Sequence, residues 1–255
     1  MATGDIPRTG GEDLRRELCN WLRLVELSGT REILLPRVAL AEADSSSPGV
    51  SQTDSGGRMR DLASLRETVS SCTRCGLHST RTKVVFGEGD PSSRLMFVGE
   101  GPGGDEDQKG EPFVGRAGML LTRIIQAMGL KREDVYITNV VKCRPPGNRD
   151  PDLDEILECL PYLEKQVELV HPEVICTLGL VATQTITGSK SGISNMRGKT
   201  YNYKGIAVVP TFHPAACLRK PDTKKMVWED IKKVMKILDL PIRGVIRDGA
   251  GKNKH

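Results

Sequence analysis

No run of 18 consecutive apolar residues occurs in the chain, which excludes a helix that spans a membrane. The first ten residues, MATGDIPRTG, lack a basic stretch followed by an apolar one, so they do not form a secretory signal. Apolar residues make up 38% and charged residues 27% of the sequence, an ordinary balance for a globular protein. We therefore expect a cytoplasmic protein without membrane contacts.

The chain also lacks an even set of cysteines. The seven present are Cys19, Cys72, Cys75, Cys143, Cys159, Cys176 and Cys217. Thiols in a reducing compartment are poor candidates for disulfides, and clustered ones are interpreted first as metal ligands. Cys72 and Cys75 form a C-x2-C pair, and Cys143 and Cys159 follow farther along the chain. These split pairs fit a four-thiolate site for an iron–sulfur cluster or for zinc, and spacing alone does not choose between them.

The charge of the chain is unevenly distributed. The formal net charge is +4, but residues 1–57 contain six basic and nine acidic side chains, which leaves 31 basic and 24 acidic ones in 58–255. A basic body of this kind suits a polyanion such as DNA, although many basic domains bind no nucleic acid.

The composition divides the chain into an N-terminal extension over 1–57, a main domain over 58–241 and a basic, disordered tail over 242–255. Within the extension, leucines at helical spacing predict a short amphipathic helix over 12–25. The stretch 43–57 is rich in Ser, Gly and Pro without an apolar period, which predicts a flexible linker.

Short apolar runs alternate with helical patterns along the main domain. Strands are expected over 94–99, 135–140, 174–178 and 206–210, and helices near 116–128, 153–169, 179–187 and 223–238. A hairpin is expected over 196–209, with its turn near Lys204 and Gly205. This alternation predicts an α/β fold: a three-layer α/β/α sandwich with a mostly parallel central sheet of about four strands.

Three chemically distinctive segments each follow an expected strand. They cover 100–113, 142–148 and 211–219. Ligands of an open parallel sheet bind in the crevice outside the carboxyl ends of its strands. We therefore expect these three segments to meet at one edge of the sheet.

The first segment belongs to GEGPGGDEDQKGEPFVG at 99–115, which contains a G-x-G-x-x-G match. A dinucleotide site is disfavoured because Pro102 interrupts the turn, the acidic run at 105–107 would repel a pyrophosphate, and the next helix begins late. A glycine loop that approaches a neutral base closely fits better. Phe113 is then either a core residue or a platform on which a planar base stacks.

Asn139 and His213 each lie at the carboxyl end of an expected strand. The Asn139 amide offers one acceptor and two donors, which complement N3–H and O4 of uracil and mismatch cytosine. A turn or capping asparagine is the alternative. His213, locked by Pro214, is placed to donate a hydrogen bond to a developing oxyanion, unless it is a structural histidine.

Taken together, these residues resemble family 4 uracil-DNA glycosylase. The motifs that carry the resemblance are C-x2-C, G-E-x-P-G-x-x-E-D, G-E-P-F-V-G-R-A-G, T-N-V-V-K-C-R-P-P and H-P-x-x-x-L-R. They occur in this order across about 65–238. The resemblance implies a monofunctional glycosylase of base-excision repair that acts as a monomer on uracil-containing DNA, single- or double-stranded.

The resemblance also implies roles for individual residues. A [4Fe–4S] cluster would be held by Cys72, Cys75, Cys143 and Cys159. Phe113 would stack on the everted uracil, Asn139 would read its polar edge, and His213 would stabilise the departing anion. Gly99 and Gly101 would line the pocket with backbone atoms. The residues expected to enter the duplex or contact its phosphates are Leu218, Arg219, Lys142, Arg144 and Arg149.

Two points stay open. Family members usually carry alanine at the position of Gly101, and the side chain that handles water is either Glu100 or Glu106, of which Glu106 is preferred. The short stretch between Cys143 and Cys159 has no histidine, so self-crosslinking to DNA is not expected.

The alternative function is a non-catalytic iron–sulfur module that binds damaged DNA, and the extension offers a place for a repair or replication partner.

Overall fold

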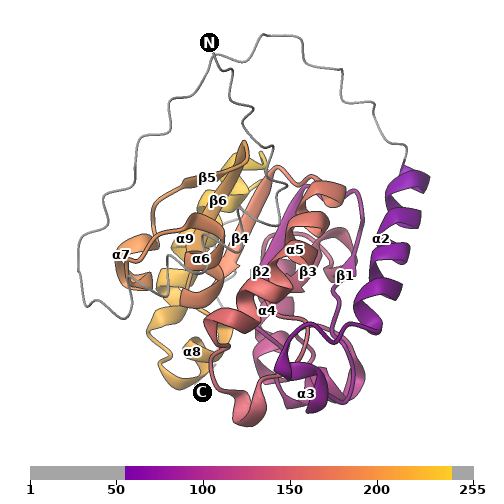
Figure 1. The fold of residues 1–255 in the computed structure, drawn as a ribbon. Helices are drawn as coiled ribbons and strands as arrows, with labels where there is room; N and C mark the ends of the chain where they lie inside the picture. The colour runs from indigo at the N-terminus through magenta and orange to yellow at the C-terminus, as the bar shows by residue number, and fades with distance from the viewer. Residues whose placement is uncertain (1–54, 243–255) are drawn as a thin grey trace, which may run out of the picture. The chain divides into compact units, whose positions relative to one another are not determined.

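The computed structural model describes residues 55–242 (Figure 1). The chain separates into two units, Met1–Val50 and Ser51–His255, and only the second contains described residues. The amphipathic helix expected over 12–25 and the basic tail beyond Ile242 therefore lie outside the described residues.

A six-stranded sheet with the order β1-β3-β2-β4-β6-β5 forms the centre of the fold (Figure 1). Its strands are β1 (Glu88–Gly89), β2 (Leu95–Gly99), β3 (Tyr136–Asn139), β4 (Val174–Leu178), β5 (Tyr201–Tyr203) and β6 (Ile206–Thr211). The four middle strands are parallel, whereas β1 and β5 pair antiparallel at the two edges. The expected parallel core is thus confirmed, and the sheet is two short edge strands wider than expected.

The edge strands differ in how well the sequence indicated them. Strand β5 is the first arm of the expected hairpin, whose turn places Lys204 at φ 51° and Gly205 at φ 88°. Two consecutive positive φ values are typical of the two-residue turns that join antiparallel strands. Strand β1 contains only two residues, which is too short to produce a periodic pattern.

Helices cover both faces of the sheet. They are α2 (Ser55–Ser70), α3 (Gly104–Lys109), α4 (Arg116–Ala127), α5 (Leu153–Val170), α6 (Leu180–Thr187), α7 (Ile193–Met196), α8 (Pro214–Arg219) and α9 (Thr223–Ile237), with short 3-10 turns η1 (Gly76–Ser79), η2 (Arg132–Asp134) and η3 (Pro146–Asn148). Apolar residues of α2, α5 and α6 pack on one face, and those of α4, α8 and α9 on the other. None of the helices between residues 55 and 242 combines the length and the apolar character needed to cross a bilayer.

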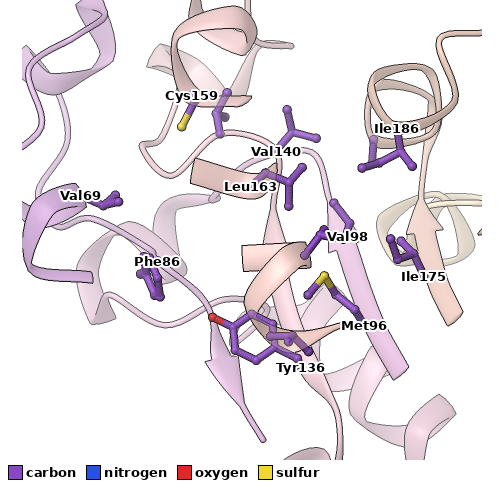
Figure 2. Close-up of a cluster of buried hydrophobic side chains, with 14 of the residues drawn as sticks. Val69, Phe86, Met96, Val98, Tyr136, Val140, Cys159, Leu163, Ile175 and Ile186 are labelled. Atoms are coloured by element: carbon purple, nitrogen blue, oxygen red, sulfur yellow. The ribbon is translucent and has the colours of Figure 1, made fainter. Parts of the chain in front are cut away.

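Successive residues of β2, β4 and β6 belong to alternate apolar clusters, one on each face of the sheet. On β4, Ile175 faces the α5 side, while its neighbours Val174 and Cys176 face the α9 side. Figure 2 shows residues of the first cluster, among them Ile175 of β4, Leu163 of α5 and Ile186 of α6. Every residue of β2, β3 and β4 is buried, as parallel strands covered on both faces require.

Helix α2 begins inside the stretch that the sequence indicated as a linker. It spans Ser55–Ser70 and packs on α5, with Leu62 and Val69 in the first apolar cluster. Arg66 donates a hydrogen bond of 2.7 Å to the carbonyl of Gly87. The folded part of the chain therefore includes residues just before 58.

The carboxyl ends of the parallel strands meet at one edge of the sheet. Gly99 pairs with Asn139 at the ends of β2 and β3, and Leu178 pairs with Thr211 at the ends of β4 and β6. Helices α3 and α8, which follow β2 and β6, lie at this same end (Figure 1). The three distinctive segments of the sequence are thus brought together, as expected.

Candidate active site

A pocket of about 400 Å³ opens at this edge of the sheet. Its lining residues are Glu100, Gly101, Pro102, Gly103, Glu106, Phe113, Ala117, Asn139, Pro145, Asn148, Arg149, Asp150, His213, Ala215 and Arg219. These residues come from the loops after β2, α3, β3 and β6, from the end of β3, and from helices α3, α4 and α8. The pocket therefore collects in one place the aromatic ring, the amide and the imidazole that the sequence singled out.

Phe113 forms one wall of the pocket and has an unusual backbone. Its side chain is 6% exposed, and its φ is +52°, in the left-handed region that a phenylalanine rarely adopts. Its ring lies beside the imidazole of His213, with 5.5 Å between ring centroids and an interplanar angle of 32°. A strained residue of this kind persists only where its surroundings hold it, and such residues cluster at binding sites.

Glu106 holds the segment around Phe113 in place. One carboxylate oxygen accepts hydrogen bonds from the backbone N–H groups of Val114 and Gly115, both at 2.9 Å, and the other accepts from Gly103 at 3.1 Å. Both oxygens are thus engaged by the backbone of two loops. These contacts position the two loops, and Glu106 and Glu100 both stay candidates for the carboxylate that handles water.

Asn139 lies at the bottom of the pocket, where β3 ends. Its side chain is 1% exposed, and its Oδ1 is a buried polar atom without a hydrogen-bond partner, the one such side-chain atom within residues 55–242. Gly99 makes this position possible, because a Cβ at Gly99 would lie 2.4 Å from Asn139 Oδ1 and 2.5 Å from Cζ of Phe113. Native proteins rarely leave such an acceptor unpaired, since the cost is about 1–3 kcal/mol. Oδ1 of Asn139 is therefore available to accept a hydrogen bond from a ligand in the pocket.

His213 is the residue before α8, and its ring has a defined tautomer. Nδ1 accepts a hydrogen bond of 3.1 Å from the backbone N–H of Ala215, which leaves the proton of the neutral ring on Nε2. Burial lowers the pKa of His213 to about 4, and the positive charge of Arg219 acts in the same direction. At neutral pH the ring is therefore an uncharged donor at the pocket wall.

Glu100 is the second carboxylate of the pocket. Burial raises the pKa of Glu100 to about 7, and the negative charge and the hydrogen bond of Asp150 add to this rise. Its carboxyl group therefore titrates near neutrality, which is the range that suits a general base at neutral pH. The partner Asp150 and the nearby Asn148 were missed in the sequence, where only their basic neighbour Arg149 was singled out.

Four of the residues expected to contact DNA lie on α8 or in the segment after β3. Arg219 lines the pocket, and Leu218, beside it on α8, is 45% exposed. Arg144 donates to Asn148 Oδ1 at 2.8 Å, and Arg149 forms a bidentate ion pair with Glu155 at 2.7 and 2.9 Å. Arg149 also lines the pocket and is exposed, as is Arg219, whereas Arg144 is half-buried.

Lys142, in contrast, is wrongly assigned to phosphate contact. Its side chain is 1% exposed, and its ammonium donates to Thr138 Oγ1, Asn139 O and Gln166 Oε1 inside the protein. Burial lowers the pKa of Lys142 to about 7, while the nearby thiols of Cys159 and Cys143 act in the opposite direction. A side chain in this position does not reach a phosphate.

The four cysteines singled out in the sequence line a second pocket. Cys72, Cys75, Cys143 and Cys159 meet there, although they come from the segment after α2, the loop after β3 and helix α5. Cys176 and Cys217 are buried in the apolar cluster on the other face of the sheet, as small core residues. The chain therefore separates four grouped thiols from two isolated ones among its described residues.

Hydrogen-bond donors point at three of the four sulfurs. Arg81 donates to Cys143 at 3.2 Å, the backbone N–H of Lys142 donates to Cys159 at 3.3 Å, and the hydroxyl of Tyr162 donates to Cys72 at 3.3 Å. Such donors stabilise thiolates, which are the metal-binding form of cysteine.

The arrangement of these side chains is compatible with two kinds of metal centre. Between residues 55 and 242, no three Cys, His, Asp or Glu side chains form a group that could hold a metal ion as they stand. Both zinc and iron–sulfur clusters use four thiolates, so the arrangement of the four cysteines fits either centre.

The fold and the pocket agree with the comparison to known proteins. A model of the uracil DNA glycosylase superfamily matches residues 86–232, which include both carboxylates, Phe113, Asn139 and His213. The chain belongs to the uracil-DNA glycosylase superfamily.

Comparison with individual relatives indicates the branch of the superfamily to which the chain is most similar. A type-4 uracil-DNA glycosylase of Sulfurisphaera tokodaii is 47% identical over 197 residues, which cover 74% of this chain and 90% of the relative. A type-4 uracil-DNA glycosylase of Thermotoga maritima is 49% identical over 173 residues, 66% of this chain and 90% of the relative. A type-5 uracil-DNA glycosylase of Pyrobaculum aerophilum is 29% identical over 69% of this chain and 84% of the relative. The chain groups with the type-4 proteins, and the resemblance stated from the motifs is confirmed.

Proposed function

We propose that the protein is a monofunctional uracil-DNA glycosylase, which everts deoxyuridine from DNA and hydrolyses its N-glycosidic bond to leave an abasic site. The observation that carries the proposal is the unpartnered Oδ1 of Asn139 at the bottom of the pocket. Uracil presents N3–H as a donor and O4 as an acceptor, and an asparagine amide complements both. Cytosine presents an acceptor at N3, which would leave Oδ1 without a donor.

The remaining residues supply the chemistry. Cleavage is dissociative: the C1′–N1 bond breaks, its electron pair leaves with uracil, and an oxocarbenium-like sugar remains. The Nε2–H of His213 donates to O2 of the departing uracil anion, on which the charge develops. The carboxylate of Glu100 orients a water molecule, takes one of its protons and stabilises the cationic sugar while the hydroxide bonds to C1′.

The direct test is a glycosylase assay on an oligonucleotide with one uracil. Purified protein should release free uracil and leave a strand that alkali cleaves at that position, and oligonucleotides with thymine or cytosine there should stay intact. A protein that binds the uracil-containing strand without releasing the base would instead be the non-catalytic damage-binding module.

We expect the single-turnover rate to rise as the pH increases through about 7. Glu100 acts in its ionised form, and burial raises its pKa to about 7, so the active form accumulates above that pH. The measurement is the pH–rate profile of the wild-type protein and of three variants. Glu100→Gln should remove the rise, and Asp150→Asn should move it to lower pH because the negative charge of Asp150 raises the pKa.

Glu111→Gln serves as the matched control for this profile. Glu111 is an exposed glutamate after α3 that does not line the pocket. An unaltered rise in all three variants would assign the titration to another group and remove Glu100 from its role.

Leu218→Ala should weaken binding to duplex DNA that contains uracil by about tenfold, because an apolar side chain that fills the space of the everted nucleotide is lost. Met59→Ala is the control, since Met59 is an exposed apolar side chain, at 61% against 45%, on α2, which contributes no residue to the pocket. Fluorescence anisotropy with labelled duplex measures both affinities. Equal weakening by the two substitutions would contradict the assignment.

We further infer that Cys72, Cys75, Cys143 and Cys159 hold a [4Fe–4S] cluster. The inference is supported by the shared pocket of the four cysteines, the donors at their sulfurs and the similarity to type-4 uracil-DNA glycosylases. When bound, such a cluster cross-links the segment after α2 to the loop after β3 and to α5. We assign it no step in the reaction.

Cys143→Ala should abolish a broad absorbance near 400 nm in the purified protein and lower its thermal unfolding temperature. Iron–sulfur clusters absorb in this region, whereas d¹⁰ zinc does not. Cys217→Ala is the matched control, because Cys217 is equally buried but lies in the other apolar cluster. A colourless wild-type protein with bound zinc would overturn the assignment of iron.

A DNA substrate and reduced thiols fit the cytoplasm, where we place the protein as a monomer. We assign the extension before residue 55 to a repair or replication partner, and deletion of that extension should leave uracil release by the remaining chain intact.

A further inference from the structure

A buried polar network lies directly behind Asn139, on the α5 side of the sheet. Its centre is the ammonium of Lys142, which donates to the backbone carbonyl of Asn139 at 2.6 Å, to Gln166 Oε1 at 2.6 Å and to Thr138 Oγ1 at 2.7 Å. Gln166 in turn donates to Phe86 O at 2.8 Å. The residue that reads the base is therefore held from behind by a charged side chain.

The same lysine adjoins the four-cysteine pocket, which it helps to line. Its backbone N–H donates to the sulfur of Cys159 at 3.3 Å, and Cys143 is its neighbour in sequence. Helix α5 supplies both Cys159 and Gln166, two turns apart and hence on one helix face. Lys142 thus contacts the base-reading strand on one side and the thiols on the other.

The electrostatics of this position are unusual. The three acceptors of the ammonium are neutral, and none of the ion pairs between residues 55 and 242 involves Lys142. A buried cation without a compensating negative charge costs several kcal/mol. Cys143 and Cys159 line the second pocket together with Lys142, and they would supply the compensating negative charge as thiolates when they bind a metal centre.

We propose that Lys142 is a positioning residue that couples the four-cysteine centre to base recognition: the negative thiolates retain its ammonium in the interior, and the ammonium fixes the backbone of Asn139. The proposal rests on the proposed function. It gives the metal centre a defined influence on the pocket without a step in the reaction.

The test compares Lys142→Met with Lys165→Met, an exposed lysine of α5 that pairs with Glu168. For each protein, four quantities are measured: the single-turnover rate of uracil release, the inhibition by free uracil, the visible absorbance per chain and the reduction potential of the centre. In Lys142→Met the rate and the affinity for free uracil should each fall about tenfold. The absorbance should be kept, and the potential should become more negative because a positive charge near the thiolates is lost. Lys165→Met should match the wild type in all four.

If Lys142→Met does not fold, Gln166→Leu decides, since it removes one acceptor of the ammonium and leaves Asn139 untouched. The rate and the affinity for free uracil should again fall and the absorbance should be kept, while the potential should stay near that of the wild type because the positive charge is retained. Unchanged release and unchanged inhibition by uracil would overturn the proposal. So would a loss of absorbance that parallels the loss of rate, because Lys142 would then only support the centre. Absence of uracil release by the wild-type protein would instead refute the proposed function, and the shift in potential would still report whether Lys142 acts on the thiolates.

Discussion

Replacing His213 with alanine should slow the single-turnover release of uracil by about 100-fold or more, which corresponds to about 3 kcal/mol of transition-state stabilisation. The reason is the position of one proton. The backbone N–H of Ala215 occupies Nδ1, so the donor on Nε2 is fixed before substrate arrives. Burial keeps the pKa of His213 at about 4, so the donor stays neutral and is not titrated near pH 7.

Binding should respond much less than the rate, because charge on uracil O2 develops mainly as the glycosidic bond breaks. The affinity of His213→Ala for uracil-containing duplex is therefore expected to stay within about threefold of the wild type. His171→Asn is the control, since His171 ends α5 with a φ of +49°, a conformation that asparagine tolerates. A near-normal rate in His213→Ala would show that the oxyanion is stabilised elsewhere.

Asn139→Ala should lower the single-turnover rate on uracil by about tenfold to 100-fold without loss of protein stability. The amide contributes its hydrogen bonds only when a base occupies the pocket, because Oδ1 has no partner within the protein. Its removal also relieves a buried, unpaired acceptor, so the thermal unfolding temperature should be equal to or above that of the wild type. Activity and stability thus change independently or in opposite directions, as is common at binding sites.

Asn202→Ala provides the comparison for this variant. Asn202 lies in the edge strand β5, where Oδ1 accepts from the backbone N–H of Gly205 at 3.1 Å. Its replacement should leave the rate unchanged and slightly lower the unfolding temperature. If Asn139→Ala unfolded at a clearly lower temperature and kept its rate, Asn139 would be a structural residue rather than a reader of the base.

Much of the fold and of the pocket could be predicted because their signals are local. The four parallel strands are short apolar runs, and every residue of β2, β3 and β4 is buried. All of them except Asn139 are apolar, small or hydrogen-bonded within the protein. Asn139 and His213 were identifiable because each follows such a run, and the carboxyl ends of parallel strands share one edge.

The errors concern residues whose surroundings come from distant parts of the chain. A lysine beside a strand end ordinarily points to solvent, but Lys142 is buried because Gln166 and Thr138 supply acceptors for its ammonium. The backbone partners of the Glu106 carboxylate were also not predicted. Those partners, at Val114 and Gly115, depend on how the loop returns after Phe113, which no periodicity encodes.

The backbone bonds of Glu106 have a consequence for how the binding energy of DNA is used. The Glu106 side chain joins the segment before α3, at Gly103, to the segment before α4, at Val114 and Gly115. These hydrogen bonds form when the chain folds, so the pocket around the base is ordered before DNA binds. The entropy of ordering that pocket is lost when the chain folds, not at the encounter with DNA. Phosphate contacts are consequently free to offset the few kcal/mol needed to break the stacking of a deoxyuridine with its neighbours.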